Sequence, residues 1–335
     1  MTGPAVAILL STYNGARFLT AQLDSFLTQS YPNWVLVWRD DGSSDGSVAV
    51  VREFAARTGA GRCVESVSSG PHLGAAHSFL TLLSECQGYE LIAFADQDDV
   101  WLPEKLQHAV QRIGQEGEQA VLYCARQLLV DAELQGAKLS AAHGNPLGFP
   151  ACLTQNIANG NTLVMNQAAA ALVVNMGQPE GTIHDWWSYI VVSACGGKVI
   201  FDERPQVLYR LHKANLIGKA RPLPLRALAA LRRGPGVYMT MMRRHADALA
   251  AHAGLLPPQT RRSLKRIQAA LDGGVLPRLK ALSCPRLRRS TKLENLLFAY
   301  WFISEKPMTA ASKLAARQSP LPLPHWAPRE HKAAE

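Results

Sequence analysis

Leu91-Ile-Ala-Phe-Ala-Asp-Gln-Asp-Asp-Val-Trp-Leu102 is an apolar run that ends on three carboxylates within four positions, those of Asp96, Asp98 and Asp99. Like charges this close repel and raise one another's pKa, and their neighbours are apolar or neutral. A divalent metal carrying substrate phosphates would neutralise them, since Mg²⁺ and Mn²⁺ are usually held by one or two carboxylates with phosphate oxygens and water. The alternative is an acidic turn that caps a helix beginning near Pro103.

Short apolar runs alternate with helical patterns on both sides of this stretch. We expect strands at 6–10, 34–38, 62–67, 90–95 and 120–130. Between them we expect helices at 18–27, 47–56, 75–84 and 103–113. This alternation predicts an α/β fold with a mostly parallel sheet wrapped by helices.

Polar clusters follow four of these strands in succession. They lie at 11–15, 40–45, 68–74 and 96–99. Ligands of open α/β sheets bind at the carboxyl ends of the strands, so we expect the clusters to line one crevice. The chain has neither a Gly-x-Gly-x-x-Gly after its first strand nor a P-loop motif, which argues against both of those nucleotide sites.

The charge of the 335-residue chain divides it into two unlike parts. Residues 1–218 hold 13 Lys+Arg against 20 Asp+Glu, and residues 219–335 hold 22 against 6, which together give the net +9. We therefore predict an α/β domain over 1–218 and a basic helical region over 219–318. A proline-rich tail at 319–335 is expected to be flexible. Within the basic region, helical patterns occur at 225–233, 237–253, 258–271, 275–282 and 291–303.

Three motifs occur in an order that matches a known enzyme family. They are Ser11-Thr-Tyr-Asn-Gly15, Arg39-Asp-Asp-Gly-Ser-Ser-Asp-Gly-Ser47 and Ala95-Asp-Gln-Asp-Asp-Val-Trp101. With them the chain resembles the inverting family-2 glycosyltransferases of the GT-A fold, and most of all the bacterial rhamnosyltransferase-type enzymes of O-antigen or capsular polysaccharide synthesis. The resemblance covers about 5–218 and implies a GT-A, Rossmann-like sheet flanked by helices.

The first two motifs carry the predicted contacts to the donor nucleotide. Tyr13 at a strand end can stack on a pyrimidine, and Thr12 can hydrogen-bond the base or ribose. Asp40 or Asp41 can accept from a pyrimidine N3–H, and the resemblance implies that this acidic pair contacts the base. The structural alternative for 40–47 is a turn and helix N-cap.

The resemblance implies separate roles for the aspartates of the third motif. Asp96 would contact the ribose and Asp98 the metal that bridges the diphosphate, while Asp99 supports these contacts or caps the next helix. Further on, Arg210 and His212 form a cationic, metal-capable pair, and the rhamnosyltransferase-like members carry a similar segment. We predict Arg210 as a phosphate clamp and His212 as a metal ligand, with a structural histidine as the alternative.

His184-Asp185-Trp186-Trp187 is the candidate for the acceptor side. The resemblance implies Asp185 as the general base for the acceptor hydroxyl, and the two tryptophans offer apolar faces on which sugar rings can stack. A buried aspartate capping a helix with two core tryptophans is the alternative. The preceding Gly160-Asn161-Thr162 matches the family's acceptor-side loop and favours the functional interpretation.

These predictions describe a metal-dependent inverting glycosyltransferase. The donor would be dTDP-L-rhamnose or a UDP-sugar, the cofactor Mg²⁺ or Mn²⁺, and the acceptor a saccharide or a lipid-linked saccharide. The alternative enzyme is a metal-dependent nucleotidyltransferase acting on a sugar phosphate, for which 11–17 is a poor phosphate-binding loop. A nucleic-acid binder would leave the acidic part unexplained, and the basic tail has few interleaved aromatic residues, so we expect no nucleic-acid partner.

The basic region is expected to meet an anionic membrane surface. Clustered arginines alternate there with Leu/Ala stretches, a pattern of helices that lie on anionic lipid. Apolar stretches such as 163–176 are too short to span a bilayer. We therefore expect a cytoplasmic chain, peripheral on the inner face of the cytoplasmic membrane. The alternatives for the tail are a solvated bundle and an oligomer interface.

Overall fold

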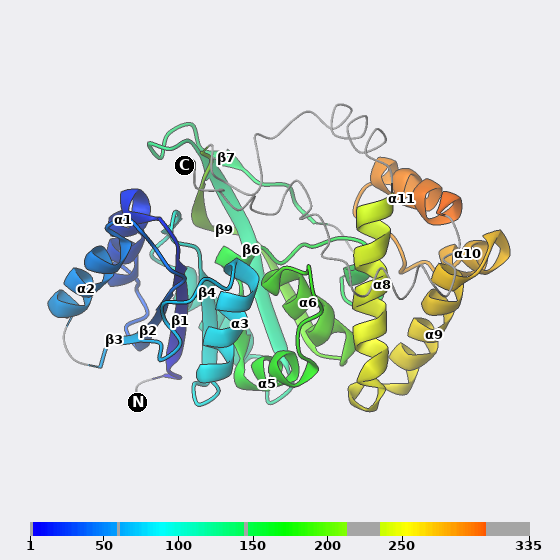
Figure 1. The fold of residues 1–335 in the computed structure, drawn as a ribbon, viewed down its shortest axis with the longest axis horizontal. Helices are drawn as coiled ribbons and strands as arrows, with labels where there is room; N and C mark the ends of the chain where they lie inside the picture. The colour runs from blue at the N-terminus through cyan, green and yellow to red at the C-terminus, as the bar shows by residue number, and fades with distance from the viewer. Residues whose placement is uncertain (1–2, 59–60, 144–146, 213–234, 306–335) are drawn as a thin grey trace.

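A computed structural model describes residues 3–58, 61–143, 147–212 and 235–305 (Figure 1). A mixed sheet lies at its centre, in the order β3-β2-β1-β4-β8-β6-β9-β5, with β7 paired to β6. The strands are β1 (Val6–Thr12), β2 (Trp34–Asp40), β3 (Cys63–Glu65), β4 (Leu91–Ala95), β5 (Val100–Trp101), β6 (Val121–Val130), β7 (Lys138–Leu139), β8 (Val164–Asn166) and β9 (Lys198–Arg210). Strands β1 to β4 pair in parallel, as do β6 and β9, whereas β8 runs antiparallel to β4 and β6.

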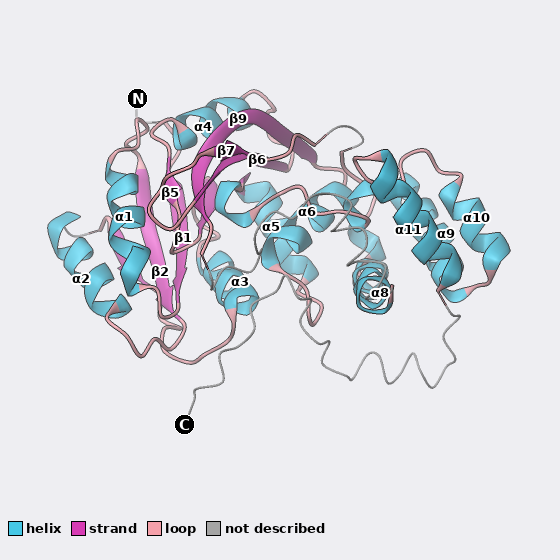
Figure 2. Ribbon diagram, turned by 90° about the horizontal axis from the view of Figure 1, so that it is seen from above, coloured by secondary structure: helices cyan, strands magenta, loops and turns pink. Residues whose placement is uncertain are grey.

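Helices cover both faces of this sheet (Figure 2). Those that pack on one face are α1 (Ala16–Leu27), α2 (Ser47–Thr58) and α4 (Lys105–Gly114). Those that pack on the other are α3 (Ala75–Glu85), α5 (Gln167–Met176) and α6 (His184–Ala194). The predicted α/β fold with a mostly parallel sheet flanked by helices is confirmed.

Strand β1 shows why the sheet needs both helical layers. All of its first five residues are apolar and fully buried. Side chains alternate between the two faces of a strand, so Ile8 packs into the core under α1 and Leu9 into the core under α3. A strand that is apolar on both faces is typical of a central position in a parallel sheet.

Four basic helices lie at the far end of the molecule from α1 and α2 (Figure 1). They are α8 (Gly236–Ala251), α9 (Pro258–Asp272), α10 (Val275–Leu282) and α11 (Lys292–Ser304). Their apolar side chains belong to the same core as α3, α5 and α6. The Tyr238 hydroxyl donates to the Thr154 carbonyl at 3.0 Å, and the Arg289 guanidinium donates to the same oxygen at 3.0 Å. The helical region is thus packed against the α/β domain.

The expected strands and helices of the described part appear with small shifts at their ends, and several further elements were not expected. The segment 163–176 reads as one apolar run, but Asn166 ends β8 and its side chain caps α5 by accepting from the Ala169 amide at 3.0 Å. The long strand β9 was also not predicted. The expected helix at 225–233, the tail at 319–335 and the boundary at 218/219 lie outside the described residues, so that division stays a prediction. Within the described part, no helix is long and apolar enough to cross a membrane.

Candidate active site

The carboxyl ends of β1, β2 and β4 meet at one edge of the sheet. Thr12 lies beside Asp40 in the β1–β2 register, and Leu10 lies beside Ala95 in the β1–β4 register. The Thr12 hydroxyl donates to Asp40 Oδ1 at 2.9 Å. The three sequence motifs therefore come together at one place, because parallel neighbouring strands end at the same edge.

Gln97 joins the first motif to the third, a role that sequence reasoning missed. The Tyr13 amide donates to Gln97 Oε1 at 2.8 Å, and Gln97 Nε2 donates to the Tyr13 carbonyl at 2.9 Å. A Cβ on Gly15 would overlap the Gln97 side-chain amide, which would have to leave its place beside Tyr13. The paired backbone bonds hold Tyr13 next to the aspartates. The polar residue inside Asp-Gln-Asp-Asp was the available signal.

Tyr13 is 38% exposed at this edge. Its ring centroid lies 4.6 Å from that of His72, which follows β3 in the 68–74 cluster. The His72 ring nitrogen Nδ1 lies 3.0 Å from Asp41 Oδ2. These two neighbouring rings are both open to solvent and offer a surface of the kind on which a base stacks.

Asp40 and Asp41 are both buried, with different surroundings. Asp40 accepts from the hydroxyls of Thr12 and Ser43, at 2.9 and 2.6 Å, and from two backbone amides. Asp41 pairs with the fully buried Arg39 and accepts from the Leu73 and Gly74 amides at 2.7 and 2.9 Å. A base contact by Asp41 does not fit this set, because both of its oxygens hold the loop before α3. Hydroxyl donors can turn to other acceptors, so the base contact by Asp40 stays a prediction.

The acidic triplet has hydrogen-bond partners within the protein. Within the described residues its sequence neighbours supply none, but residues far along the chain do. Asp99 is fully buried, and its Oδ2 accepts from the Asn161 side-chain amide while its Oδ1 accepts from the Arg210 amide at 3.1 Å. These partners lie 62 and 111 residues away along the chain. Asp99 is therefore a structural link between the triplet, the 160–162 loop and the end of β9.

Asp98 has a different partner, the His212 imidazole. His212 Nε2 lies 2.8 Å from Asp98 Oδ2, and the His212 ring stacks on Phe18 with centroids 4.6 Å apart. This separation is that of a direct hydrogen bond. A divalent cation held by both atoms would replace that bond with little movement, because adjacent ligands of an octahedral Mg²⁺ with bonds of about 2.1 Å lie roughly 3 Å apart. Within the described residues, no cluster of three or more Asp, Glu, His or Cys could hold a metal without help. Phosphate oxygens and water would have to supply the remaining ligands.

Asp96 of the triplet interacts electrostatically with the buried Lys105. Burial raises the pKa of Asp96 to about 8, and the charges of Asp98 and Asp185 add to that rise, while Lys105 opposes it. Burial lowers the pKa of the Lys105 ammonium well below its ordinary value. Lys105 Nζ lies 3.1 Å from the centroid of the Trp101 ring and has no hydrogen-bond acceptor among the described residues. A positive charge from outside the protein would favour the charged form of Asp96.

Arg210 holds the backbone of the triplet. Its side chain is buried, its Nε donates to the Asp98 carbonyl at 2.8 Å, and its NH1 donates to the Ala132 carbonyl at 2.5 Å. Two guanidinium nitrogens are thus bound to main-chain carbonyls, and the phosphate clamp stays a prediction. Arg210 therefore positions Asp98.

Asp185 stands at the first turn of α6. Its Oδ2 accepts from the Gly160 amide at 2.9 Å, and its Oδ1 accepts from the Trp186 amide. Burial raises the pKa of Asp185 to about 6, although these amides and the Asn156 side chain oppose the rise. Gly160 directly precedes Asn161, which binds Asp99. Two successive residues therefore bind Asp185 and Asp99. A carboxylate with such a pKa can accept a proton near neutral pH.

The predicted sugar-stacking surfaces of Trp186 and Trp187 are wrong. Both indoles are buried, and both pack against the ring of His245 from α8. Their ring nitrogens donate to the Cys152 and Gly177 carbonyls. The aromatic residues after Asp185 therefore form the contact with the helical region, and the sequence alone does not show that α8 covers α6.

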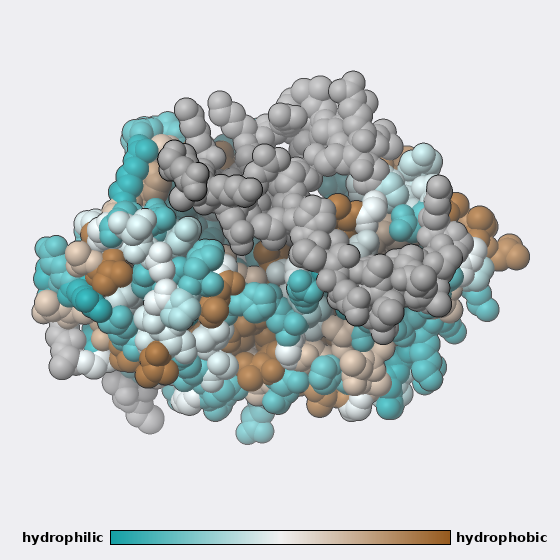
Figure 3. All heavy atoms as spheres, viewed as in Figure 1, coloured by the Kyte–Doolittle hydropathy of each residue, from teal (hydrophilic) through white to brown (hydrophobic). Residues whose placement is uncertain are grey.

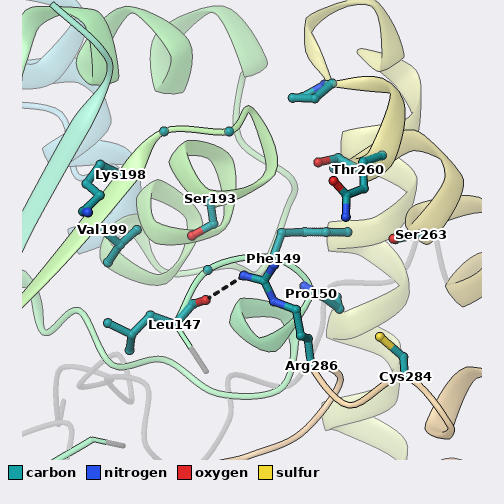
Figure 4. Close-up of a pocket in the computed structure, with 15 residues that line it drawn as sticks. Leu147, Phe149, Pro150, Ser193, Lys198, Val199, Thr260, Ser263, Cys284 and Arg286 are labelled. Carbon is teal, nitrogen blue, oxygen red and sulfur yellow. Dashed lines mark hydrogen bonds between the residues drawn. The ribbon is translucent and has the colours of Figure 1, made fainter. Parts of the chain in front are cut away.

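A separate cavity of about 430 Å³ lies at the other end of α6, where the α/β domain meets the basic helices (Figure 4). Ser193, Lys198, Thr260, Cys284 and Arg286 are among its lining residues. Arg286 NH2 donates to the Leu147 carbonyl at 3.4 Å across its rim (Figure 4). None of the strand-end residues described above lines this cavity.

Comparison with known proteins agrees with the geometry of the strand ends. The model of the family "Glycosyl transferase family 2" matches residues 7–131, which carry all three motifs. Residues 7–131 form a glycosyl transferase family 2 domain. The matched part contains Thr12, Asp40 and Asp98 and ends before Asp185.

Proteins that this chain resembles carry names of glycosyltransferases. UDP-Glc:alpha-D-GlcNAc-diphosphoundecaprenol beta-1,3-glucosyltransferase WfgD of Escherichia coli is 34% identical over 102 residues, 30% of this chain and 38% of that protein. The dTDP-rhamnosyl transferase RfbG of Shigella flexneri is 24% identical over 226 residues, 62% of this chain and 73% of that protein. The first match thus spans well under half of that relative's length.

The fold also resembles a solved structure. TarS residues 1–349 of S. aureus in complex with UDP aligns with a TM-score of 0.54 at 14% identity, covering 89% of this chain and 87% of that one. At this identity the likeness shows the fold and nothing finer. The α/β sheet with its flanking helices matches GT-A glycosyltransferase structures.

Proposed function

We propose that this chain, whose residues 7–131 match the family-2 model, is a glycosyltransferase that moves a sugar from a nucleotide-diphosphate donor to a saccharide acceptor in the synthesis of a cell-surface polysaccharide. The observation that carries the proposal is a pair of adjacent residues, Gly160 and Asn161. The Gly160 amide donates to Asp185, and the Asn161 side chain donates to Asp99 of the acidic triplet. A donor site and a base are thereby held side by side on the same loop. The relatives' names support the reaction class.

The strand-end residues would bind the donor. Tyr13 stacks on the base beside His72, Thr12 and Asp40 hydrogen-bond the nucleoside, and Asp96 accepts from the ribose hydroxyls. Asp98 and His212 would hold a divalent cation, Mg²⁺ or Mn²⁺, through the oxygen and nitrogen that lie 2.8 Å apart. When bound, such a cation neutralises the charge that develops on the leaving diphosphate.

Asp185 would act as the general base. Its carboxylate takes the proton of the acceptor hydroxyl, whose oxygen attacks the anomeric carbon while the bond to the diphosphate oxygen breaks. One displacement of this kind inverts the configuration at that carbon. The two amides that donate to Asp185 keep the carboxylate oriented, and its raised pKa makes it a stronger base than an exposed aspartate.

The nucleotidyltransferase alternative is disfavoured by the loop after β1. A triphosphate would need free backbone amides there. The Gly15 amide instead donates to Ser47 Oγ at 2.8 Å, and the Ala16 amide donates to Asp45 Oδ2 at 3.1 Å. These bonds use Asp45 and Ser47 of the second motif to fix the first.

For the finer identity of the substrates we propose L-rhamnose from dTDP-L-rhamnose, with a UDP-sugar as the other donor to test. A lipid-linked saccharide is the proposed acceptor, at the inner face of the cytoplasmic membrane. The motif resemblance and the name of the Shigella flexneri relative support the sugar, and the name of the Escherichia coli relative supports the lipid.

A donor-hydrolysis screen with the full chain tests this function. Nucleotide release from dTDP- and UDP-sugars should require Mg²⁺ or Mn²⁺ and stop with a chelator. Asp98→Asn should lose metal-dependent donor binding measured by calorimetry, whereas Asp185→Asn should keep donor binding and lose transfer. Asp24→Asn, a change on the outer surface of α1, should behave as wild type. Release that is unaffected by either site variant would contradict the proposal.

A further inference from the structure

The end of the molecule farthest from the donor site exposes large apolar side chains. Leu276 is 80% exposed and Leu296 is 70% exposed. We call the exposed set on α10 and α11 the apolar end surface; it consists of Val275, Leu276, Leu279, Leu293, Leu296 and Tyr300. Figure 3 shows apolar atoms gathered at this tip, over α10. The spacing on each helix places its members on one face.

Helix α10 buries the cation Arg278 and exposes its aliphatic face. Arg278 is buried, its Nε donates to the Ala270 carbonyl at 3.1 Å, and its NH1 donates to the Ile303 carbonyl at 3.0 Å. These carbonyls lie near the C-terminal ends of α9 and α11, which a cation satisfies. If α10 were rotated about its axis to bury its leucines, Arg278 would lose its hydrogen bonds to both carbonyls. The contacts of Arg278 therefore fix the aliphatic face outward.

The neighbouring helix α9 presents an exposed cationic face. Arg261, Arg262, Lys265 and Arg266 are all exposed, and none pairs with an acidic side chain of the described residues. Their spacing along the helix places them on one side. Residues 236–305 hold 12 Lys+Arg against 4 Asp+Glu, so the surroundings do not neutralise them. Aliphatic side chains beside an unneutralised cationic face are typical of surfaces that lie in the headgroup region of an anionic bilayer.

We propose that the apolar end surface, together with the cationic face of α9, docks on an anionic lipid bilayer. A second copy of the chain placed on this surface would bring like charges together, and a nucleic acid offers nothing to the aliphatic side chains. The inference deepens the proposed function, since it assigns the peripheral position to named residues. Helix α8 packs on α6, so docking would also fix the orientation of the helix that bears Asp185.

Vesicle flotation of the full chain tests the proposal. Wild type should float with phosphatidylcholine vesicles containing phosphatidylglycerol and stay behind with phosphatidylcholine alone. Leu276→Asp/Leu279→Asp should weaken binding by about tenfold or more, because two aliphatic contacts are lost and two negative charges are added. Arg261→Glu/Arg262→Glu should weaken it by at least about fivefold per cation lost, and the remaining binding should depend less steeply on salt, because less of it is electrostatic.

Matched controls keep the outcome interpretable. Val67→Asp changes an apolar residue that is 95% exposed on the α/β domain, and Arg112→Glu/Lys138→Glu changes two exposed cations there. Both controls should float as wild type does. Flotation of the Leu276/Leu279 variant at the wild-type level would overturn the proposal. So would light scattering that shows a dimer of wild type, a monomer of that variant and no lipid binding by either.

The donor-hydrolysis assay separates this inference from the proposed function. The Leu276/Leu279 variant should release nucleotide from the donor at the wild-type rate, since its changes lie far from the strand ends. Lipid binding that fails while hydrolysis persists would overturn only the docking surface. If wild type does not hydrolyse any donor, the glycosyltransferase assignment is overturned. The flotation result would still show whether the surface binds lipid.

Discussion

At the scale of single residues, the site depends on a division of labour among similar carboxylates. Asp99 has a structural role, since it links the triplet to Asn161 and to the end of β9 by hydrogen bonds. Asp98 faces His212, and Asp185 faces two amides at the start of α6. The environment of each aspartate, and not its place in the motif, therefore determines what it can do.

The environment of Asp185 leads to a prediction about pH. Its pKa is raised to about 6, chiefly by burial. A general base must be unprotonated, so kcat/KM for transfer should rise through about pH 6 and fall about tenfold per unit below it. Steady-state rates between pH 4.5 and 8 at saturating metal would show this limb. Asp185→Asn should leave only a low activity without that limb; a wild-type profile that stays flat from pH 7 to pH 5 would exclude Asp185 as the base.

At the scale of secondary-structure elements, single polar side chains fix where strands give way to helices. Asn166 ends β8, and its Oδ1 accepts from the amides of Ala169 in α5 and Val121 in β6, at 3.0 and 2.9 Å. Its Nδ2 donates to the Gln119 carbonyl at 2.7 Å. This one side chain therefore connects β8, α5 and β6.

Replacing Asn166 with alanine should destabilise the protein. The change removes a helix N-cap and two further hydrogen bonds, so we expect the free energy of unfolding to fall by about 2 kcal/mol. Urea unfolding followed by tryptophan fluorescence measures the loss. Asn175→Ala on the exposed face of the same helix is the control and should leave the midpoint nearly unchanged. Equal midpoints for the two variants would contradict the role given to Asn166.

At the scale of the whole molecule, the basic helices and the α/β domain share one core through His245. This fully buried imidazole lies 2.7 Å from the Thr182 hydroxyl and packs on both tryptophans that follow Asp185. Burial lowers the pKa of His245 to about 3, so it is neutral in the folded protein. The helical region therefore supports the helix that carries the proposed base.

The neutral His245 makes folding sensitive to acid. An unfolded histidine takes up a proton near pH 6.5, so the stability it contributes is present above that pH and is lost as the pH falls toward 3. His245→Phe should destabilise the protein at pH 7.5, and its cost should be smaller at pH 5.5 by about 1 kcal/mol. Urea unfolding at both values measures the difference. The exposed His77→Phe is the control, and an equal cost of His245→Phe at both pH values would contradict the prediction.

The sequence by itself determined the order of the βα units and the clustering of the motifs at one edge of the sheet. Apolar periodicity is local, and parallel strands must end together, so Thr12, Asp40 and Asp98 could be grouped without coordinates. The same reasoning could not separate Asp98 from Asp99, because their partners come from β9 and the 160–162 loop.

Only the tertiary structure decided the roles that depend on distant neighbours. It buried Trp186 and Trp187 under α8, turned Arg210 toward carbonyls, and showed that Gln97 binds Tyr13. It also placed Arg278 inside and the leucines of α10 outside, against the simplest expectation for a helix. The physical reason is common to all of these: a side chain's chemistry is set by the groups that surround it, and those come from segments far along the chain.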